Sequence, residues 1–69
     1  MRVLVNGEET ELPEGGISLA QLLVSAGVED TAAVSVQHNG AFVDPQQYDA
    51  LILADGDAVE FLYFLGGGR

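Results

Sequence analysis

Residues 18–27 read SLAQLLVSAG and carry the clearest helical pattern of the sequence. Its apolar residues recur at the i, i+3, i+4 and i+7 spacing of one helical face, at Leu19, Leu22, Leu23 and Ala26. Ser18 with Gln21 three residues later matches the capping box that begins many helices. Gly27 suits the position just past a helix end, where φ is often positive. The stretch therefore predicts one amphipathic helix.

A β-hairpin is expected before this helix. Apolar residues alternate through Val3 and Val5, and the Asn6-Gly7 pair that follows is favoured in tight hairpin turns. The second strand is expected over residues 10–12, ended by Pro13.

Strand patterns also follow the helix. The alternation of Val34 and Val36 predicts a strand that closes at a second turn, Asn39-Gly40. A single helical turn is expected over residues 46–50, and a short edge strand over Leu51–Leu53.

The last strand is expected over residues 58–65, with Val59 and Phe61 facing inward. The helix supplies the crossover that parallel pairing requires, so the first and last strands are expected to be parallel neighbours at the sheet centre. The predicted fold class is α+β: a ubiquitin-like β-grasp, with a mixed four- to five-stranded sheet and one main helix across it. Residues 1–65 would form one domain, and residues 66–69 a flexible glycine-rich tail.

Length and composition narrow the function classes. A chain of 69 residues has room for one small core and no enclosed active-site cleft. With 48% hydrophobic and 19% charged residues, the chain is too apolar for a disordered tail, and its apolar runs are too short for a membrane span. The lack of cysteine excludes disulfides and thiolate metal sites. The N-terminus lacks the pattern of a secretory signal, so we expect a cytoplasmic protein.

The charge balance is strongly acidic. Eleven Asp and Glu residues stand against two arginines and no lysine, giving a net charge of −9. Nucleic acids and anionic membranes are therefore not expected as partners, because phosphate contacts need clustered cations. Two interpretations of the acids stay open: a solvated surface, or steering toward a basic partner.

The residue types that commonly form catalytic or metal sites do not indicate such a site in this sequence. His38 is the single histidine and is expected to be a solvent-exposed turn residue. Asp55 and Asp57 flank Gly56 as turn residues, without the further ligands of a calcium loop. The adjacent Glu8 and Glu9 would point to opposite faces of a strand. No cofactor is expected.

The glycine run at residues 66–68 is the unusual feature. It cannot cradle a phosphate as a glycine-rich loop does, because no helix follows it. A frayed end is one interpretation. The other is a thin thread without Cβ atoms, which at ~3.3 Å per residue reaches about 13 Å beyond the sheet and can enter a narrow tunnel in another protein.

Five short motifs are spread over essentially the whole chain. They are VLVNGEE at residues 3–9, LAQLL at 19–23, VQHNG at 36–40 with Val43, DGDAVE at 55–60 and FLGGG at 64–68. Together they resemble the ThiS family, the ubiquitin-like sulfur carriers of thiamine biosynthesis. The DGDAVE turn followed by the terminal glycines is the most specific part.

The resemblance implies a carrier protein, not an enzyme. A ThiF-like enzyme would adenylate the terminal glycine carboxylate with ATP, at Gly68 or Gly67, with Gly66 as part of the tail. Sulfur from a persulfide would then give a thiocarboxylate, and a ThiG-like thiazole synthase would receive the sulfur. Related β-grasp carriers serve molybdopterin, cysteine or homocysteine synthesis.

Arg69 departs from the family pattern, in which the chain ends at a glycine. Either a peptidase removes Arg69, as in carriers made as precursors, or Arg69 was added to the protein's own end. The precursor type is associated with amino-acid and siderophore pathways more than with thiamine. A β-grasp interaction or modifier domain is the alternative of another class.

A docking surface is expected beside the root of the tail. Strand alternation places Leu4, Leu62 and Phe64 on the sheet face away from the helix, as an exposed apolar patch. Contiguous exposed apolar patches usually mark docking surfaces for partner proteins, and partial burial of these side chains under the tail is the other interpretation.

Overall fold

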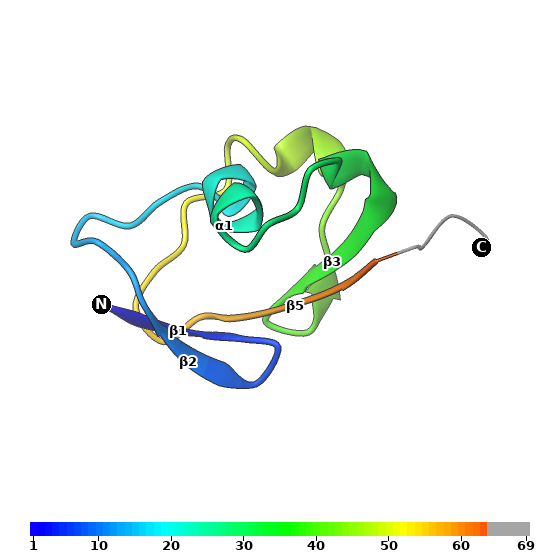
Figure 1. Cartoon of the computed structure of the whole chain (residues 1–69). Helices are drawn as coiled ribbons and strands as arrows, with labels where there is room; N and C mark the ends of the chain where they lie inside the picture. The colour runs from blue at the N-terminus through cyan, green and yellow to red at the C-terminus, as the bar shows by residue number, and fades with distance from the viewer. Residues whose placement is uncertain (64–69) are drawn as a thin grey trace.

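One mixed sheet of five strands carries an α-helix on one of its faces (Figure 1). The computed structural model describes residues 1–63, without the side chains of Ala32 and Tyr63. The sheet has the order β2-β1-β5-β3-β4. The strands are β1 (Arg2–Val5), β2 (Glu8–Glu11), β3 (Val34–His38), β4 (Ala41–Phe42) and β5 (Ala58–Tyr63). The strands β1 and β5 are parallel neighbours at the centre, which confirms the predicted β-grasp.

Helix α1 (Leu19–Ser25) begins and ends as its sequence predicts. The Ser18 hydroxyl accepts from the Gln21 N–H at 3.1 Å, and the Gln21 side chain accepts from the Ser18 N–H at 3.1 Å. At the other end Gly27 has φ +91°, and the N–H groups of Gly27 and Val28 donate to the carbonyls of Val24 and Leu23. This pair of bonds is the Schellman motif.

Both Asn-Gly pairs form two-residue hairpin turns. Asn6 and Gly7 have φ of 51° and 86°, and Asn39 and Gly40 have φ of 52° and 87°, so all four occupy the left-handed region. These values suit the type I′ turn, whose twist matches that of the strands. The first turn pairs Val5 directly with Glu8, so β2 begins two residues before the expected Thr10.

The core lies between α1 and the inner face of the sheet. Its buried residues are Val3, Leu12, Leu19, Leu22, Leu23, Val28, Val34, Val36, Tyr48, Leu53 and Val59. Ala26, expected on the apolar stripe of the helix, is exposed because the helix ends there. Tyr48 is buried and its hydroxyl donates to the Val34 carbonyl at 3.3 Å. Burial, with a smaller effect of Asp44, raises the pKa of Tyr48.

The connection between β4 and β5 differs from the expectation. The helical turn is a 3₁₀ turn, η2 (Pro45–Gln47), which begins where an Asp44 side-chain oxygen accepts from the Gln46 N–H at 2.9 Å. The predicted edge strand Leu51–Leu53 is wrong. Within residues 1–63 this segment makes a single bridge, between Ile52 and Ser18, because its backbone bonds the start of α1 instead of another strand.

Gly16 gives a direct test of how closely this segment packs. A Cβ at Gly16 would lie 2.5 Å from the Leu53 carbonyl oxygen, whereas a Cβ at Gly15 would meet nothing within 4 Å. Both residues have positive φ, so Gly15→Ala should cost about 1 kcal/mol of unfolding free energy. Gly16→Ala should cost a further ~1–3 kcal/mol, measured by urea unfolding. Equal losses for the two variants would contradict the close approach of Gly16 to Leu53.

Candidate functional site

The sheet face opposite α1, here called the outer face, displays apolar side chains. The register places Ser35 opposite Leu62, and Gln37 between Glu60 and Phe42, so these side chains share one face. Leu62 is 72% exposed and Phe42 is 74% exposed. Two large apolar side chains are therefore exposed to solvent on this face, Leu62 on the tail-bearing strand β5 and Phe42 on the edge strand β4.

Phe42 and Leu62 flank a surface hollow over β5, here called the outer hollow. It is lined by Asn6, Ser35, Gln37, Phe42, Glu60, Phe61 and Leu62. The surface of this hollow is mostly apolar, with the exposed carboxylate of Glu60 among its polar groups. An apolar depression with one carboxylate fits a partner surface that brings an apolar side chain and a cation.

Leu4 is also exposed, at 41%, but lies apart from Leu62. It pairs with Ala58, four residues before Leu62 along β5, and it lines a different hollow with Arg2, Glu9 and Gly56. Phe64, the third residue of the predicted patch, lies outside the described residues. The docking role of these three side chains stays a prediction.

Sequence reasoning missed Phe42 as a surface residue of this face. The signal was present, because a two-residue turn at Asn39-Gly40 pairs Gln37 with Phe42. Side chains of paired residues lie on the same face, and Gln37 alternates with the inward Val36. Counting outward from the turn therefore gives the orientation of Phe42.

The strand that leads to the tail, β5, is paired with a neighbouring strand on each side. β5 pairs with β1 through Ala58 and Val59, and with β3 from Val59 to Tyr63. It ends at the opposite side of the molecule from the N-terminus (Figure 1). The structure does not describe the tail residues Gly66, Gly67, Gly68 and Arg69, so their roles stay predictions. The structure thus gives a tail-bearing strand anchored on both sides.

His38 differs from its expectation as a solvent-exposed turn residue. Its side chain is partly buried, and its Nε2 lies 2.9 Å from Oδ2 of Asp57. Asp57 also accepts from the Ala54 N–H at 2.8 Å and from the Asn39 side chain at 3.2 Å. These contacts fasten the end of β3 to the start of β5. In the described part of the chain, no group of three His, Cys, Asp or Glu residues could hold a metal ion.

The Asp57 carboxylate is stabilised by these bonds. Burial raises the pKa of Asp57, but the hydrogen bonds from His38, Ala54 and Asn39 outweigh burial, so the pKa lies below its ordinary value. A depressed carboxyl pKa stabilises the folded state above the unfolded-state pKa. That contribution is lost as the pH falls through the folded-state pKa.

Acid should therefore weaken the link between β3 and β5. We expect Asp57→Asn to lower the unfolding free energy at pH 7, and the difference from the unaltered protein to shrink below about pH 4 as Asp57 is protonated. Urea unfolding at pH 7, 5 and 3 measures this difference. A difference that stays constant down to pH 3 would show that the Asp57 charge contributes nothing.

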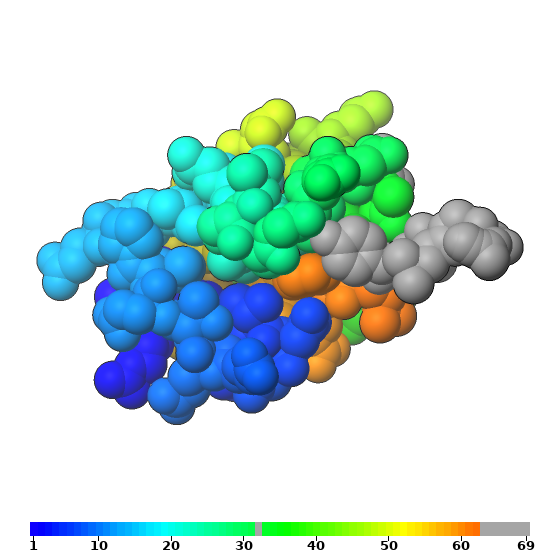
Figure 2. All heavy atoms as spheres, viewed as in Figure 1, coloured from blue at the N-terminus to red at the C-terminus, as the bar shows by residue number. Residues whose placement is uncertain are grey.

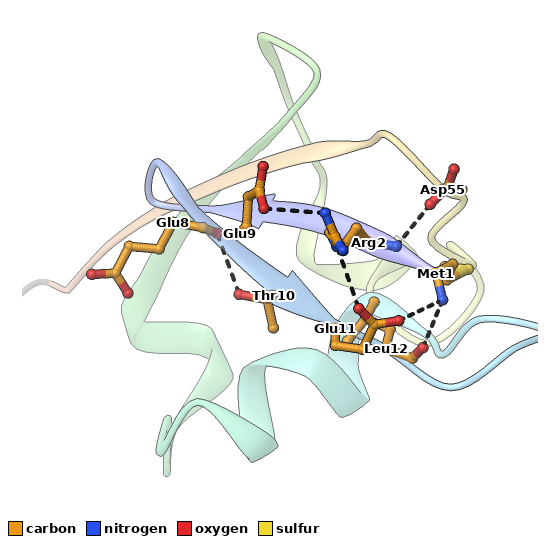
Figure 3. A network of polar contacts seen from close by, with 8 residues as sticks. All are labelled: Met1, Arg2, Glu8, Glu9, Thr10, Glu11, Leu12 and Asp55. Carbon is orange, nitrogen blue, oxygen red and sulfur yellow. Dashed lines mark hydrogen bonds and ion pairs between the residues drawn. The ribbon is translucent and has the colours of Figure 1, made fainter.

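The two cations of the described chain, Arg2 and the N-terminal amine, lie against the β1–β2 hairpin. Figure 3 shows the Arg2 side chain between Glu9 and Glu11, at 3.4 Å from each carboxylate. The N-terminal amine lies 3.1 Å from Glu11, and these cations lower the pKa of Glu11, the amine more than Arg2. Asp55 accepts from the Arg2 N–H at 2.7 Å. No ion pair within residues 1–63 includes Glu60 of the outer hollow.

In the space-filling view the β1–β2 hairpin adjoins the segment that contains α1, and atoms of β5 lie beside the hairpin (Figure 2). No helix within the described residues is long and apolar enough to cross a membrane.

A β-grasp domain with an anchored last strand and an exposed apolar face is the architecture of a ubiquitin-like carrier or modifier. Comparison with known proteins identifies the family: the sequence pattern of the ThiS family matches residues 2–68. The chain therefore belongs to the ThiS family.

Solved structures agree with this assignment. The crystal structure of thiamine biosynthesis protein ThiS from Geobacter metallireducens is 38% identical, with a TM-score of 0.81 over 99% of this chain and 100% of that one. The solution structure of a thiamine biosynthesis protein from the same organism is 37% identical, with a TM-score of 0.80 over 100% of this chain and 90% of that one.

Two longer proteins are also similar. A thiazole synthase of Magnetococcus marinus is 35% identical over 69 residues, and one of Paramagnetospirillum magneticum is 34% identical over 68 residues. The chain spans about a fifth of these relatives, 21% and 20% of their lengths.

Proposed function

We propose that this protein is the sulfur carrier of a thiamine pathway, which presents a glycine carboxylate to partner enzymes. The observation that carries the proposal is the match to the ThiS family over residues 2–68, which includes the terminal glycines. The likeness to ThiS of Geobacter metallireducens over the whole fold supports it. In this role the domain binds partners and the tail undergoes the chemistry.

The proposed chemistry takes place at the carboxylate of Gly68. A carboxylate oxygen attacks the α-phosphorus of ATP on a ThiF-like enzyme, and pyrophosphate leaves. The acyl adenylate then has a good leaving group, AMP, which the outer sulfur of a persulfide displaces. A thiol cleaves the resulting acyl disulfide and leaves the thiocarboxylate. Residues 1–63 contribute docking and positioning to these steps, because the reacting group lies on the tail.

The proposed receiver of the sulfur is a ThiG-like thiazole synthase. Two similar proteins are thiazole synthases of which this chain matches about a fifth, so a ThiS-like segment and the synthase share one polypeptide there. Such a fusion favours a working contact between the two parts. ATP belongs to the activating enzyme, and the carrier itself needs no cofactor.

Cleavage after Gly68 is part of the proposal. Arg69 follows Gly68, so a free Gly68 carboxylate requires cleavage between these two residues, and a peptidase would act before activation. Precursors of this type also serve cysteine, homocysteine or molybdopterin synthesis in related carriers, and these are the alternative acceptors. A modifier that joins its tail to an amine is the alternative of another class.

Three forms of the protein test which carboxylate is activated. We expect the form ending at Gly68 to support ATP–pyrophosphate exchange with a ThiF-type enzyme, and the forms ending at Gly67 and Arg69 to be slower by about tenfold or more, because the reacting carboxylate is displaced. Equal exchange by the Arg69 form, without a peptidase, would refute maturation. Faster exchange by the Gly67 form would show Gly67 to be the working end.

Intact mass separates the carrier from the modifier. A thiocarboxylate raises the mass of the protein isolated from its own cells by the difference between a sulfur and an oxygen atom. An isopeptide-linked partner adds a whole protein instead. Finding the conjugate without the thiocarboxylate would favour the modifier class.

The outer hollow should be the docking surface for the activating enzyme. The Leu62 side chain is 72% exposed, so the fold should tolerate Leu62→Asp. The new carboxylate should raise KM in the exchange assay about tenfold or more. Ile52→Asp is the matched control, because Ile52 is also exposed but lies next to the start of α1. Equal effects of the two variants would refute docking at the outer hollow.

A further inference from the structure

The side chain of Asn6 binds the tail-bearing strand where β1 ends. The N–H of Leu4 donates to the Asp57 carbonyl and the N–H of Asn6 donates to the Val59 carbonyl, each at 2.9 Å. The chain then turns away from β5 at Asn6 and Gly7. The Asn6 side-chain oxygen nevertheless accepts from the Phe61 N–H at 2.9 Å. One residue thus holds two successive groups on the same edge of β5.

This bond takes the place of the next rung of the parallel ladder. In the register of the sheet, Val5 pairs with Val59, so the continuing strand would next bond the backbone of Phe61. The type I′ turn prevents this continuation, because Asn6 is already in the left-handed conformation. The amide oxygen of Asn6 supplies the acceptor that a backbone carbonyl would have supplied. It extends the hold of β1 on β5 by two residues toward the tail.

The second Asn-Gly turn makes the same contact at the other end of β5. Asn39 has φ 52°, close to the 51° of Asn6, and its side-chain oxygen accepts from the Ala58 N–H at 2.8 Å. Asn39 therefore holds the first residue of β5, and Asn6 holds its fourth. The two residues share turn type, conformation and acceptor chemistry, and they differ in distance from the tail.

We propose that Asn6 is a positioning residue for the carrier reaction, which fixes the direction in which β5 delivers the tail to a partner's active site. The inference rests on the proposed carrier function. The partner holds the domain through the outer hollow, while the reacting carboxylate lies several residues beyond Phe61. A change in the direction of β5 at Phe61 changes where the domain presents the tail to the partner, and a displacement of about 1 Å can cost roughly 10²-fold in rate. Asn39, at the start of β5, has less effect on this direction.

Three variants separate positioning from stability. Asn6→Gly keeps the positive φ and removes the acceptor, whereas Asn6→Asp tolerates that φ and keeps an oxygen acceptor. Asn39→Gly removes the equivalent acceptor at Ala58. All are made in the form ending at Gly68, and circular dichroism confirms that each is folded at the assay temperature. The readouts are kcat and KM of ATP–pyrophosphate exchange with a ThiF-type enzyme, and the exchange rate of the Phe61 amide proton by NMR.

We expect Asn6→Gly to lower kcat about tenfold with KM unchanged, and to speed exchange of the Phe61 amide. Asn6→Asp should have the kcat and the Phe61 amide exchange rate of the unaltered protein. Asn39→Gly should leave kcat within about twofold of the unaltered protein. A rise in KM with unchanged kcat would overturn the proposal, because Asn6 would then act only as a lining residue of the outer hollow. Equal losses of kcat for Asn6→Gly and Asn39→Gly would overturn it as well.

The same assay distinguishes failure of the underlying function. Absence of exchange by the unaltered Gly68 form would refute the carrier function, and the role of Asn6 with it. Exchange by the unaltered form, with full kcat in Asn6→Gly, would refute the role of Asn6 alone.

Discussion

The parallel pairing of β1 with β5 holds the sheet together at its centre. It joins strands from the two ends of the chain, through bonds such as that from the Asn6 N–H to the Val59 carbonyl at 2.9 Å. Parallel neighbours need a long connection, and the chain between β1 and β5 contains α1, which covers the apolar inner face. Once β5 lies between β1 and β3, its inner side chains complete the core and its outer side chains face solvent.

In the proposed carrier, the folded domain holds the tail-bearing strand, and the reacting group lies on the tail. The described residues pack around one small core, and they contain no group of three His, Cys, Asp or Glu residues that could hold a metal ion. The central strand is instead held by its neighbours, and the chemistry proposed for the tail is left to enzymes that bind the domain. The exposed Phe42 and Leu62 fit this division, because burial in a partner would remove their apolar surface from water.

The sequence predicted what short-range signals determine. The capping box of Ser18 and Gln21, Gly27 and the two Asn-Gly turns each act within a few residues, and the structure confirms all of them. Residues Leu51–Leu53 were wrongly predicted as a strand, because a run of apolar residues is typical of a strand. Their backbone groups instead bond residues at the start of α1. The contact of His38 with Asp57 joins residues 19 apart, and the acceptor role of Asn6 joins residues 55 apart. Such contacts appear only when the register of distant strands is known.

The negative charge of the protein can affect how fast a partner approaches, but it cannot determine how the bound partner is oriented. Arg2, the only Lys or Arg among residues 1–63, contacts Glu9 and Glu11, so the remaining acids set a negative field over the surface. A long-range field speeds the approach of a basic partner, but it is screened over about 8 Å at physiological salt and cannot fix an orientation. Orientation requires short-range contacts of fixed geometry. In the proposed complex the apolar walls and carboxylate of the outer hollow would supply such contacts between proteins, and the bond from the Phe61 N–H to Asn6 supplies one within the domain. Salt should therefore slow formation of the complex while leaving the rate of the bound tail's reaction unchanged.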